Sequence, residues 1–436
     1  MIETLNRDCF CVSVDPDALR RAIEADSAAR GLHRLIEERC PHLFAALPVF
    51  VSRRHVDAMA AVVRAVESVA ALPAYREAAV AWAPPIARFD PGTPGAFMGY
   101  DFHLGAEGPR LIEINTNAGG ALLNTVLARA QRACCEDIAS LVTGPVAAAD
   151  LERTFFEMFA AEWRSSGRSG LPKRIAIVDD TPEQQFLYPE FLLFAQLFQR
   201  FGVEAAVLDP VELSFTDGVL RDARAPIDLV YNRLTDFSLE APSHAALRDA
   251  YLARAAIVTP HPRAHAVYAD KRNLSLLTDA ALLRSWGVGE STLDTLLRGI
   301  ARTERVSAAD SDRLWAARRG LFFKPAAGFG SKAAYRGDKL TRRVWTEILA
   351  GQYVAQELVP PGERRTGPAS SMKSDVRNYV YAGEVQLLAA RIYQGQTTNL
   401  RTAGGGFAPV LTPPAPGVEQ RRPPACGTRP EAAVAG

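Results

Sequence analysis

The chain has little net charge, few cysteines and no long apolar run, and each absence excludes a class of protein. Its 50 Lys and Arg residues almost balance 49 Asp and Glu residues, so the formal charge is only +1. A nucleic-acid-binding surface normally shows a basic excess, so nucleic acid is not an expected partner. No apolar run reaches membrane-spanning length, and the first residues lack the apolar segment of a secretory signal. We therefore expect no membrane partner and a cytoplasmic location.

Two widespread phosphate-binding signatures and the usual cysteine patterns are also missing. Neither G-x-x-x-x-G-K-[ST] nor G-x-G-x-x-G occurs, which argues against a Walker-type NTPase and a Rossmann dinucleotide enzyme. The six cysteines lack the C-x-x-C spacing of a structural zinc site. We interpret them as reduced thiols, and the adjacent Cys134 and Cys135 as small apolar residues of a helix.

Length and periodicity predict a chain of two or three domains. Helix-period apolar residues, as in 55–66, predict a mostly helical N-terminal part up to about Trp82. Two strands are expected at 96–104 and 110–115, followed by a helix over about 122–141. After a Ser/Gly-rich boundary near 165–172, strands at 174–179, 204–209 and 227–233 with a helix at 189–202 predict a small open α/β domain.

The last part of the chain mixes helices with short strands, which indicates an α+β region. Strands are expected at 321–324, 353–357 and 377–381. The stretch 413–436 is dominated by Pro, Ala, Gly and Arg and is predicted to be a disordered tail.

One segment has the composition of a phosphate cradle. Lys324 follows three apolar strand residues. The same segment then continues through Gly328, Gly330, Ser331 and Lys332. Glycines let backbone N–H groups close around an anion, and lysines supply positive charge. A plain surface hairpin explains this segment nearly as well, so both interpretations stay open at this point.

A second segment carries oxygen ligands on an apolar strand. Glu113 and Asn115 point to the same face because strand side chains alternate with period two. Carboxylate and amide oxygens suit Mg²⁺, and Asp101 on the preceding strand could complete the cluster. The alternative is an ordinary polar strand face. The apolar neighbours Ile112 and Ile114 argue against it, since a partly buried unpaired carboxylate is costly.

These segments together resemble the ATP-grasp superfamily, including D-alanine:D-alanine ligases and the eukaryotic-type glutathione synthetases. Asp101 followed by the E-x-N-T stretch is similar to the family's magnesium motif. Other parts of the pattern follow downstream. They are Lys271 and Lys324 as nucleotide lysines, Gly328, Gly330 and Ser331 as the loop over the phosphates, Gln356 and Glu357 as the hinge around adenine and ribose, and Arg377 and Arg391 as arginines facing the transferred phosphate and the substrate.

The order of these parts implies a circularly permuted ATP-grasp fold, as in eukaryotic glutathione synthetases and glutathionylspermidine synthetases. The magnesium motif precedes the nucleotide-binding parts, whereas it closes the chain in most members. The implied fold class is α/β and α+β. The implied domains are 1–165 (helical part with the magnesium motif), 172–266 (small α/β pre-ATP-grasp domain), 267–412 (nucleotide-binding portion) and the tail 413–436.

The resemblance implies an ADP-forming ligase that makes a C–N bond. ATP and Mg²⁺ are the implied cofactors, and Asp101, Glu113 and Asn115 the implied metal ligands. A small-molecule carboxylate would be phosphorylated and then attacked by an amine. Which substrates these are, and whether the chain forms a homodimer, is not decided by the sequence. A non-catalytic nucleotide-binding protein and a kinase-like member that phosphorylates without ligation stay open as alternatives.

The sequence departs from the family pattern at two places. D-alanine ligases have an arginine two residues before the metal aspartate, where this chain has Gly99. Eukaryotic glutathione synthetases have a metal-binding glutamate in the phosphate loop, where residues 326–331 contain no acid. The second departure favours Asp101 as the third ligand.

Several side chains also have structural interpretations. Arg391 could form an ion pair, and Arg377 could pair with Asp375. His103 is expected to be structural because Mg²⁺ prefers oxygen. The stretch 397–406 is expected to form a loop beside the site, or else a plain turn.

Overall fold

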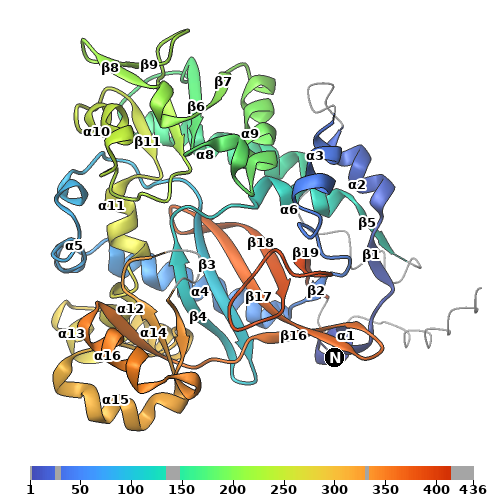
Figure 1. Ribbon diagram of the computed structural model, residues 1–436, viewed down its shortest axis with the longest axis vertical. Helices are drawn as coiled ribbons and strands as arrows, with labels where there is room; N and C mark the ends of the chain where they lie inside the picture. The colour runs from blue at the N-terminus through green and yellow to red at the C-terminus, as the bar shows by residue number, and fades with distance from the viewer. Residues whose placement is uncertain (1, 25–30, 134–147, 329–332, 414–436) are drawn as a thin grey trace, which may run out of the picture.

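The N-terminal part is mostly helical, as predicted. The computed structural model describes residues 2–24, 31–133, 148–328 and 333–413 (Figure 1). Ser52 caps the longest helix of this part by accepting a hydrogen bond from the His55 backbone, and valines recur on its buried face. The helices are α1 (Ile2–Asp8), α2 (Pro16–Ile23), α3 (Leu32–Arg39), α4 (Arg53–Ala70) and α5 (Pro73–Val80).

A large, mainly antiparallel sheet joins both ends of the chain. Its order is β2-β19-β18-β17-β3-β4, with β16 also paired to β17. The early hairpin β3–β4 therefore lies beside strands that come more than 200 residues later in the sequence, and Figure 1 shows them side by side. The strands are β2 (Val49–Phe50), β3 (Met98–Gly105), β4 (Gly108–Asn115), β16 (Gly362–Gly367), β17 (Ser370–Tyr381), β18 (Glu384–Tyr393) and β19 (Gly406–Leu411).

A second sheet is parallel and has the order β11-β10-β6-β7. Strand β6, the first of these strands in the sequence, is fully buried, which explains its continuous apolar run. Strand β6 pairs with β7 on one side and β10 on the other, so the chain order reverses between β6 and β10. The elements are α8 (Ala148–Ser165), β6 (Arg174–Val178), α9 (Tyr188–Arg200), β7 (Glu204–Leu208), β10 (Leu229–Asn232), α10 (Ala245–Leu252) and β11 (Ile257–Thr259), with the hairpin β8 (Ser214–Thr216) and β9 (Val219–Arg221).

A third, antiparallel sheet has the order β12-β15-β13-β14 and carries the predicted phosphate segment. Phe323 and Trp345 lie in its buried cluster, where their rings meet edge to face at 5.4 Å. Its strands are β12 (Thr303–Arg305), β13 (Leu321–Pro325), β14 (Tyr335–Arg336) and β15 (Tyr353–Glu357), and nearby helices are α11 (Pro262–Ala264), α12 (Asn273–Leu277), α13 (Ala280–Ser285), α14 (Glu290–Gly299), α15 (Ser311–Ala317) and α16 (Arg342–Ala350).

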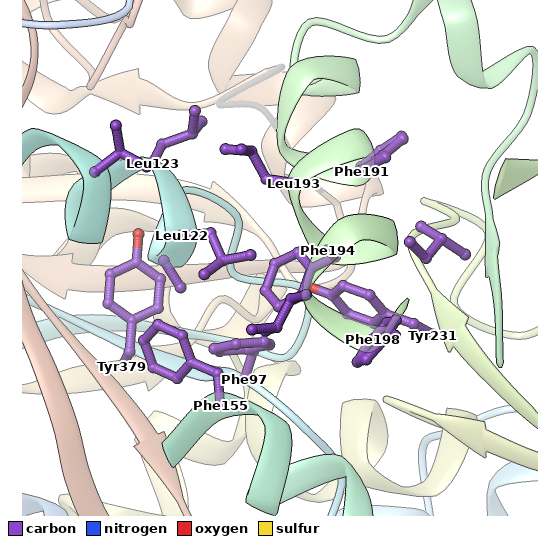
Figure 2. Close-up of a cluster of buried hydrophobic side chains, with 14 of the residues drawn as sticks. Phe97, Leu122, Leu123, Phe155, Phe191, Leu193, Phe194, Phe198, Tyr231 and Tyr379 are labelled. Atoms are coloured by element: carbon purple, nitrogen blue, oxygen red, sulfur yellow. The ribbon is translucent and has the colours of Figure 1, made fainter. Parts of the chain in front are cut away.

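An aromatic core fixes the start of β3 against the parallel sheet. Phe97 is 1% exposed and has a φ of 51°, a left-handed conformation that is strained for a bulky residue. Its ring lies 5.2 Å from Phe155 and 5.4 Å from Phe194, and Tyr379 of β17 is in the same cluster (Figure 2). The packing holds the strained backbone and thereby sets where β3 begins.

One predicted element is wrong in its second half. The helix expected over about 122–141 is observed as α6 (Ala121–Arg129), and strand β5 (Gln131–Ala133) follows directly. This strand pairs with β1 (Val12–Val14), and Ala130 accepts a hydrogen bond from the Asp15 backbone. A tertiary pairing with the N-terminus therefore ends the helix. Cys134 and Cys135 lie outside the described residues.

The other predicted strands, and the helix expected at 189–202, are confirmed with ends shifted by a few residues. The domain boundaries and the disordered tail stay predictions, since the stretch 414–436 lies outside the described part. Within the described residues, no helix combines the length and apolarity needed to cross a membrane.

Candidate functional site

Three cavities share lining residues with one another. The hinge cavity, about 110 Å³, is lined by Lys324, Gln356 and Glu113 among others. A small hollow of about 40 Å³ shares Lys324 with it and Lys271 with the next. The arginine cavity, about 230 Å³, contains Lys271, Glu113 and Arg391 in its wall. The two lysines and Glu113 therefore stand where the three cavities meet. A larger hollow of about 970 Å³, beside α1 and β16, adjoins the hinge cavity and shares Glu357, Leu358, Val359 and Pro361 with it.

The lysines converge on Glu113 from different elements. Lys324 leaves β13, and its Nζ donates to Ile112 O at 2.9 Å and to Gln356 Oε1 at 2.8 Å. Lys271 follows a short π-helical turn, and its Nζ lies 3.1 Å from Glu113 Oε1 and 3.0 Å from Gly328 O. Two positive charges therefore gather at the segment that the sequence marked as a phosphate cradle.

Burial and charge shift the acid–base properties of this group. Burial lowers the pKa of Lys324 to about 8, although Glu113 opposes the shift. Burial raises the pKa of Glu113, but Lys271 and Lys324 outweigh it and leave that pKa below its ordinary value. Glu113 is therefore ionised near neutral pH and available to a cation.

Asp101 lies across the hairpin from Glu113 and has a different environment. Its Oδ1 lies 2.6 Å from Arg377 Nε, and its Oδ2 lies 2.7 Å from Arg377 Nη2 and 2.9 Å from Arg391 Nη2. Asn115 Nδ2 donates to the same Oδ2 at 3.0 Å. Burial raises the pKa of Asp101, but the two guanidinium groups outweigh it and lower the pKa to about 2.

Both arginines occupy structural ion pairs and line the arginine cavity as well. Arg391 Nε also lies 2.7 Å from Asp375 Oδ1. The suggested pairing of Arg377 with Asp375 is wrong, because the strand register sets Arg377 opposite Asp101 and Asp375 opposite Arg391. The contact of these arginines with a phosphate stays a prediction.

Gly99 makes room for one of these arginines. Arg377 lies on the neighbouring strand, and a Cβ added at Gly99 would be 3.2 Å from its Nε and 2.6 Å from the Ala118 Cβ. The arginine that D-alanine ligases carry at this sequence position is thus absent, while Arg377 passes over the same point from β17. A side chain at residue 99 would therefore displace Ala118 or Arg377.

The predicted hinge residues line the hinge cavity but differ in exposure. Gln356 is 2% exposed, and its amide lies between Lys324 and Thr303. Glu357 is exposed and pairs with Arg110 at 2.6 Å. Their contacts with adenine and ribose stay predictions. Gly328 lines the arginine cavity, whereas Gly330 and Ser331 of the expected phosphate loop lie outside the described residues.

His103 and the stretch 397–406 lie beside the site, as expected. His103 lines the hinge cavity, and its Nδ1 lies 2.7 Å from Val359 O. This contact fits the structural interpretation of His103. Thr397 and Thr398 line the hinge cavity, and Leu400 lines the arginine cavity.

Several residues of the arginine cavity were not found by sequence reasoning. His265 stacks on Phe237 with ring centroids 3.8 Å apart, and its Nδ1 lies 3.1 Å from Thr116 Oγ1. Burial and Lys271 lower the pKa of His265 to about 3, so this wall is neutral and flat. Phe237 comes from the loop after β10 and His265 begins the short π-helical turn after α11, and no local pattern marks either ring. Thr116 alone had a signal, as part of the E-x-N-T stretch.

The glycines after the magnesium motif are held by a buried acid. Glu190 of α9 accepts hydrogen bonds from Gly120 N at 2.7 Å and Leu122 N at 3.1 Å, at the start of α6. A Cβ at Gly119 would lie 2.3 Å from Leu187 Cδ1 and 2.9 Å from Arg233 Nη2, so these two side chains would have to shift to make room for it. This contact places the end of β4 against the parallel sheet.

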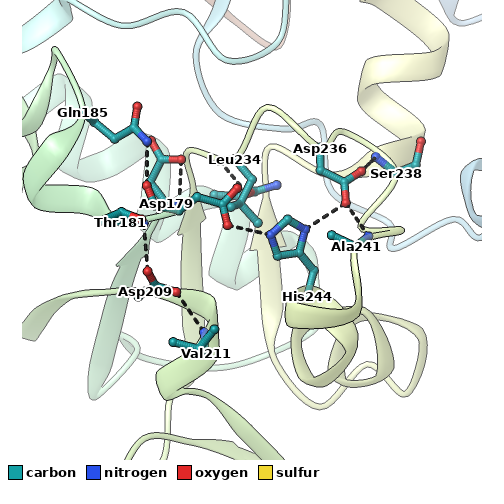
Figure 3. A network of polar contacts seen from close by, with 12 residues as sticks. Asp179, Thr181, Gln185, Asp209, Val211, Leu234, Asp236, Ser238, Ala241 and His244 are labelled. Carbon is teal, nitrogen blue, oxygen red and sulfur yellow. Dashed lines mark hydrogen bonds and ion pairs between the residues drawn. The ribbon is translucent and has the colours of Figure 1, made fainter.

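A separate polar network crosses the chain reversal of the parallel sheet. His244 is 1% exposed, and its ring lies 2.9 Å from Asp180 after β6 and 2.8 Å from Asp236 after β10 (Figure 3). Burial lowers the pKa of His244, but the two carboxylates outweigh it and raise the pKa overall. The network ties two loops together at the carboxyl edge of the sheet, a common place for ligands.

Glu113 and Asn115 offer oxygen atoms of the kind that the implied Mg²⁺ prefers. Glu113 and Asn115 both line the arginine cavity, beside Lys271, and Mg²⁺ commonly takes few protein oxygens and completes its shell with phosphate and water. These two residues fit such an ion. Asp101 is already held by two guanidinium groups, so its role as a ligand stays a prediction. Among the described residues, no group of three His, Cys, Asp or Glu side chains could hold a metal by itself.

Comparison with known proteins assigns the fold. No protein-family model matches the chain, and no curated protein matches its sequence. A glutathione synthetase-like effector from Globodera pallida aligns over 91% of this chain and 98% of its own, with a TM-score of 0.52 and 11% identity. This chain therefore shares the mixed α/β fold of that glutathione synthetase-like protein, the fold class that the resemblance implied.

Two further solved structures are similar at a lower level. A gamma-glutamylcysteine synthetase-like protein from Methylobacillus flagellatus KT aligns over 82% of this chain and 87% of its own, with a TM-score of 0.43 and 10% identity. The ATP-grasp ligase PsnB with Mg and ADP aligns over 54% and 88%, with a TM-score of 0.28 and 14% identity. The assignment of the fold rests on the first structure alone.

Proposed function

We propose that this protein is an ATP- and Mg²⁺-dependent ligase that joins a carboxylate to an amine through an acyl phosphate. The observation that carries the proposal is the meeting of Lys271, Lys324 and Glu113 where three cavities join, with Arg377 and Arg391 in the far wall. The lysines and arginines around Glu113 can neutralise the charge on a phosphoryl group while it is transferred from ATP in one cavity to a substrate in the other.

The two lysines would bind the phosphates of ATP. Lys324 faces the hinge cavity and Lys271 the arginine cavity, so the triphosphate would cross their junction. Glu113 and Asn115 would hold Mg²⁺, which supplies charge neutralisation on the phosphate oxygens when bound. With the substrate oriented by the arginines, its carboxylate oxygen forms a bond to the γ-phosphorus, and the bond to the ADP oxygen breaks.

The arginines would act in both halves of the reaction. A guanidinium binds two oxygens at once, so Arg391 and Arg377 can orient the carboxylate and then hold the charge of the acyl phosphate. The amine nitrogen attacks the carbonyl carbon, the C–O bond to phosphate breaks, and the nitrogen gives up a proton. Inorganic phosphate and the amide leave.

The strand order supports a circular permutation as part of the same proposal. Hairpin β3–β4 with the metal motif pairs with β17, although the nucleotide lysines come between them in the sequence. A cytoplasmic location and assembly as a homodimer belong to the same proposal.

Trapping the acyl phosphate tests the proposal. With ATP, Mg²⁺, hydroxylamine and pooled carboxylates, the wild type should produce ADP and a hydroxamate in equal amounts. Lys324→Met should weaken ATP binding as well as turnover, because the charge meets the phosphates in the ground state too. ADP formed with a stable phosphorylated product would favour the kinase-like alternative. ATP binding without any ADP would favour the non-catalytic one.

A further inference from the structure

A further hollow shares a lining residue with the arginine cavity. This outer cavity, about 340 Å³, is lined by Arg39, Cys40, Gln184, Phe186 and Arg401 together with Leu400. Leu400 also lines the arginine cavity, and Leu187 of that cavity directly follows Phe186. The arginine cavity alone is small for a ligand that includes a phosphorylated carboxyl group. The two hollows together reach the size of ordinary small-molecule sites.

The outer cavity is positively charged and has no acidic lining residue. Arg39 and Arg401 are exposed, and neither has an ion-pair partner among the described residues. The Arg401 guanidinium lies over the Phe186 ring at 5.5 Å, which holds it in the cavity wall. Both arginines act on the buried Cys40 thiol, where they oppose the rise that burial causes in its pKa. Arg39 is the last residue of α3 and Arg401 lies in the loop after β18, and both line this cavity.

A nearby acid does not neutralise this pair. Glu183 precedes Gln184 and acts, together with Arg39, on the pKa of Tyr188, so it lies near the rim. It is not within ion-pair distance of either arginine. Two unpaired guanidinium groups beside side-chain amides form a donor set for a carboxylate, since amides and guanidinium groups all donate N–H.

We propose that one substrate of this protein carries a second carboxylate, which binds between Arg39 and Arg401 while its reacting end lies in the arginine cavity. This inference rests on the proposed ligase function and adds the class of substrate: an acidic amino acid or a short acidic peptide. Leu400 marks the point where the chain of such a substrate passes from one hollow to the other.

Matched ligands that differ by one charge test the substrate class. Binding of glutarate and its monoamide, and of alanyl-glutamate and alanyl-glutamine, is measured by calorimetry without ATP. The wild type should bind each diacid about tenfold more tightly than its amide partner, equivalent to about 1.4 kcal/mol. The double variant Arg39→Gln/Arg401→Gln should lose this preference. Both side chains are exposed, so the variant should fold normally.

Arg34→Gln is the matched control, because Arg34 lies on the same helix but pairs with Glu38 outside the cavity. It should keep the preference. Equal binding of acid and amide, no binding of either, or a preference that survives in the double variant would overturn the inference. A diacid that binds through the two arginines but gives no hydroxamate with ATP would instead overturn the proposed ligase function. In the hydroxamate assay, the double variant should raise the KM for the diacid about tenfold and leave kcat within about twofold.

Discussion

The two acids of the β3–β4 hairpin lie directly opposite one another, yet their surroundings differ. Asp101 is fully enclosed by the arginine side, where Arg377 and Arg391 take both of its oxygens. Glu113 is on the lysine side, where a single contact to Lys271 leaves it facing the cavities. An acid whose charge is already matched holds cationic side chains in place. An acid that still faces open space can bind a cation from solution. The position of an acid in a motif therefore does not decide whether it anchors cationic side chains or binds a cation. The residues that surround it decide this.

The substitution Asp101→Asn tests whether Asp101 anchors the two arginines, and we expect it to have the largest effect. If Asp101 is an anchor, its loss leaves Arg377 buried without an acid, and the free energy of unfolding should fall by about 3–5 kcal/mol. Chemical denaturation measures this. Asp310→Asn, at an exposed pair with Arg313, should leave the unfolding midpoint nearly unchanged. A stable Asp101→Asn protein that has lost its Mg²⁺ dependence would make Asp101 a metal ligand after all.

Glu113→Gln tests the other acid. It keeps the size of the side chain and removes the charge that Mg²⁺ needs. Turnover should fall on the order of a hundredfold, equivalent to about 3 kcal/mol of barrier, while the unfolding midpoint changes little. Steady-state ADP production at saturating ATP measures the loss. Full turnover in this variant would remove the metal role and erase the contrast between the two acids.

Gly99→Ala disturbs the arginine side without touching a charge. The new Cβ would lie 2.6 Å from the Ala118 Cβ and 3.2 Å from Arg377 Nε, so something must shift. We expect a loss of about 1–3 kcal/mol in the free energy of unfolding. Gly105→Ala on the same strand meets nothing closer than 3.9 Å and serves as the control. Equal stability of both variants would show that Arg377 has room to move.

His244 extends the comparison to an ion pair that pH can neutralise. Its pKa is raised in the folded protein, so its stabilisation is full below the unfolded pKa of about 6.5 and is lost as pH rises through the folded pKa. Asp180 and Asp236 face the ring, and nearby Asp179 has a pKa raised to about 7 by burial.

The pH effect is isolated by comparing variants. His244→Gln should lower the free energy of unfolding by on the order of 1 kcal/mol near pH 6, and the difference from wild type should shrink toward pH 9. Urea denaturation across this range measures it. A difference that grows with pH would contradict the assigned direction.

The sequence predicted those parts of the site that depend on local patterns. Period-two alternation placed Glu113 and Asn115 together, and Lys324 followed from an apolar strand that ends in glycines. The partner of Arg377 could not be predicted, because it depends on the register between strands far apart in the chain.

The same limit applies to the rest of the site and to one helix. His265 and Phe237 meet only after the π-helical turn of His265 and the loop of Phe237 are folded onto each other. Helix α6 ends early because a strand near the N-terminus captures the residues after Arg129. None of these contacts can be predicted from patterns in the local sequence.

The pairing of β3 with β17 sets the order in which the site can form during synthesis. Asp101 and Arg377 are 276 residues apart in the chain. A ribosome adds about 5–20 residues per second, so the hairpin waits for some tens of seconds before its sheet partner exists. During that time the outer edge of β3 and the charge of Asp101 have no sheet or arginine to cover them. Assembly of the arginine side therefore waits until β17 and β18 have been made, and assembly of the lysine side waits for β13.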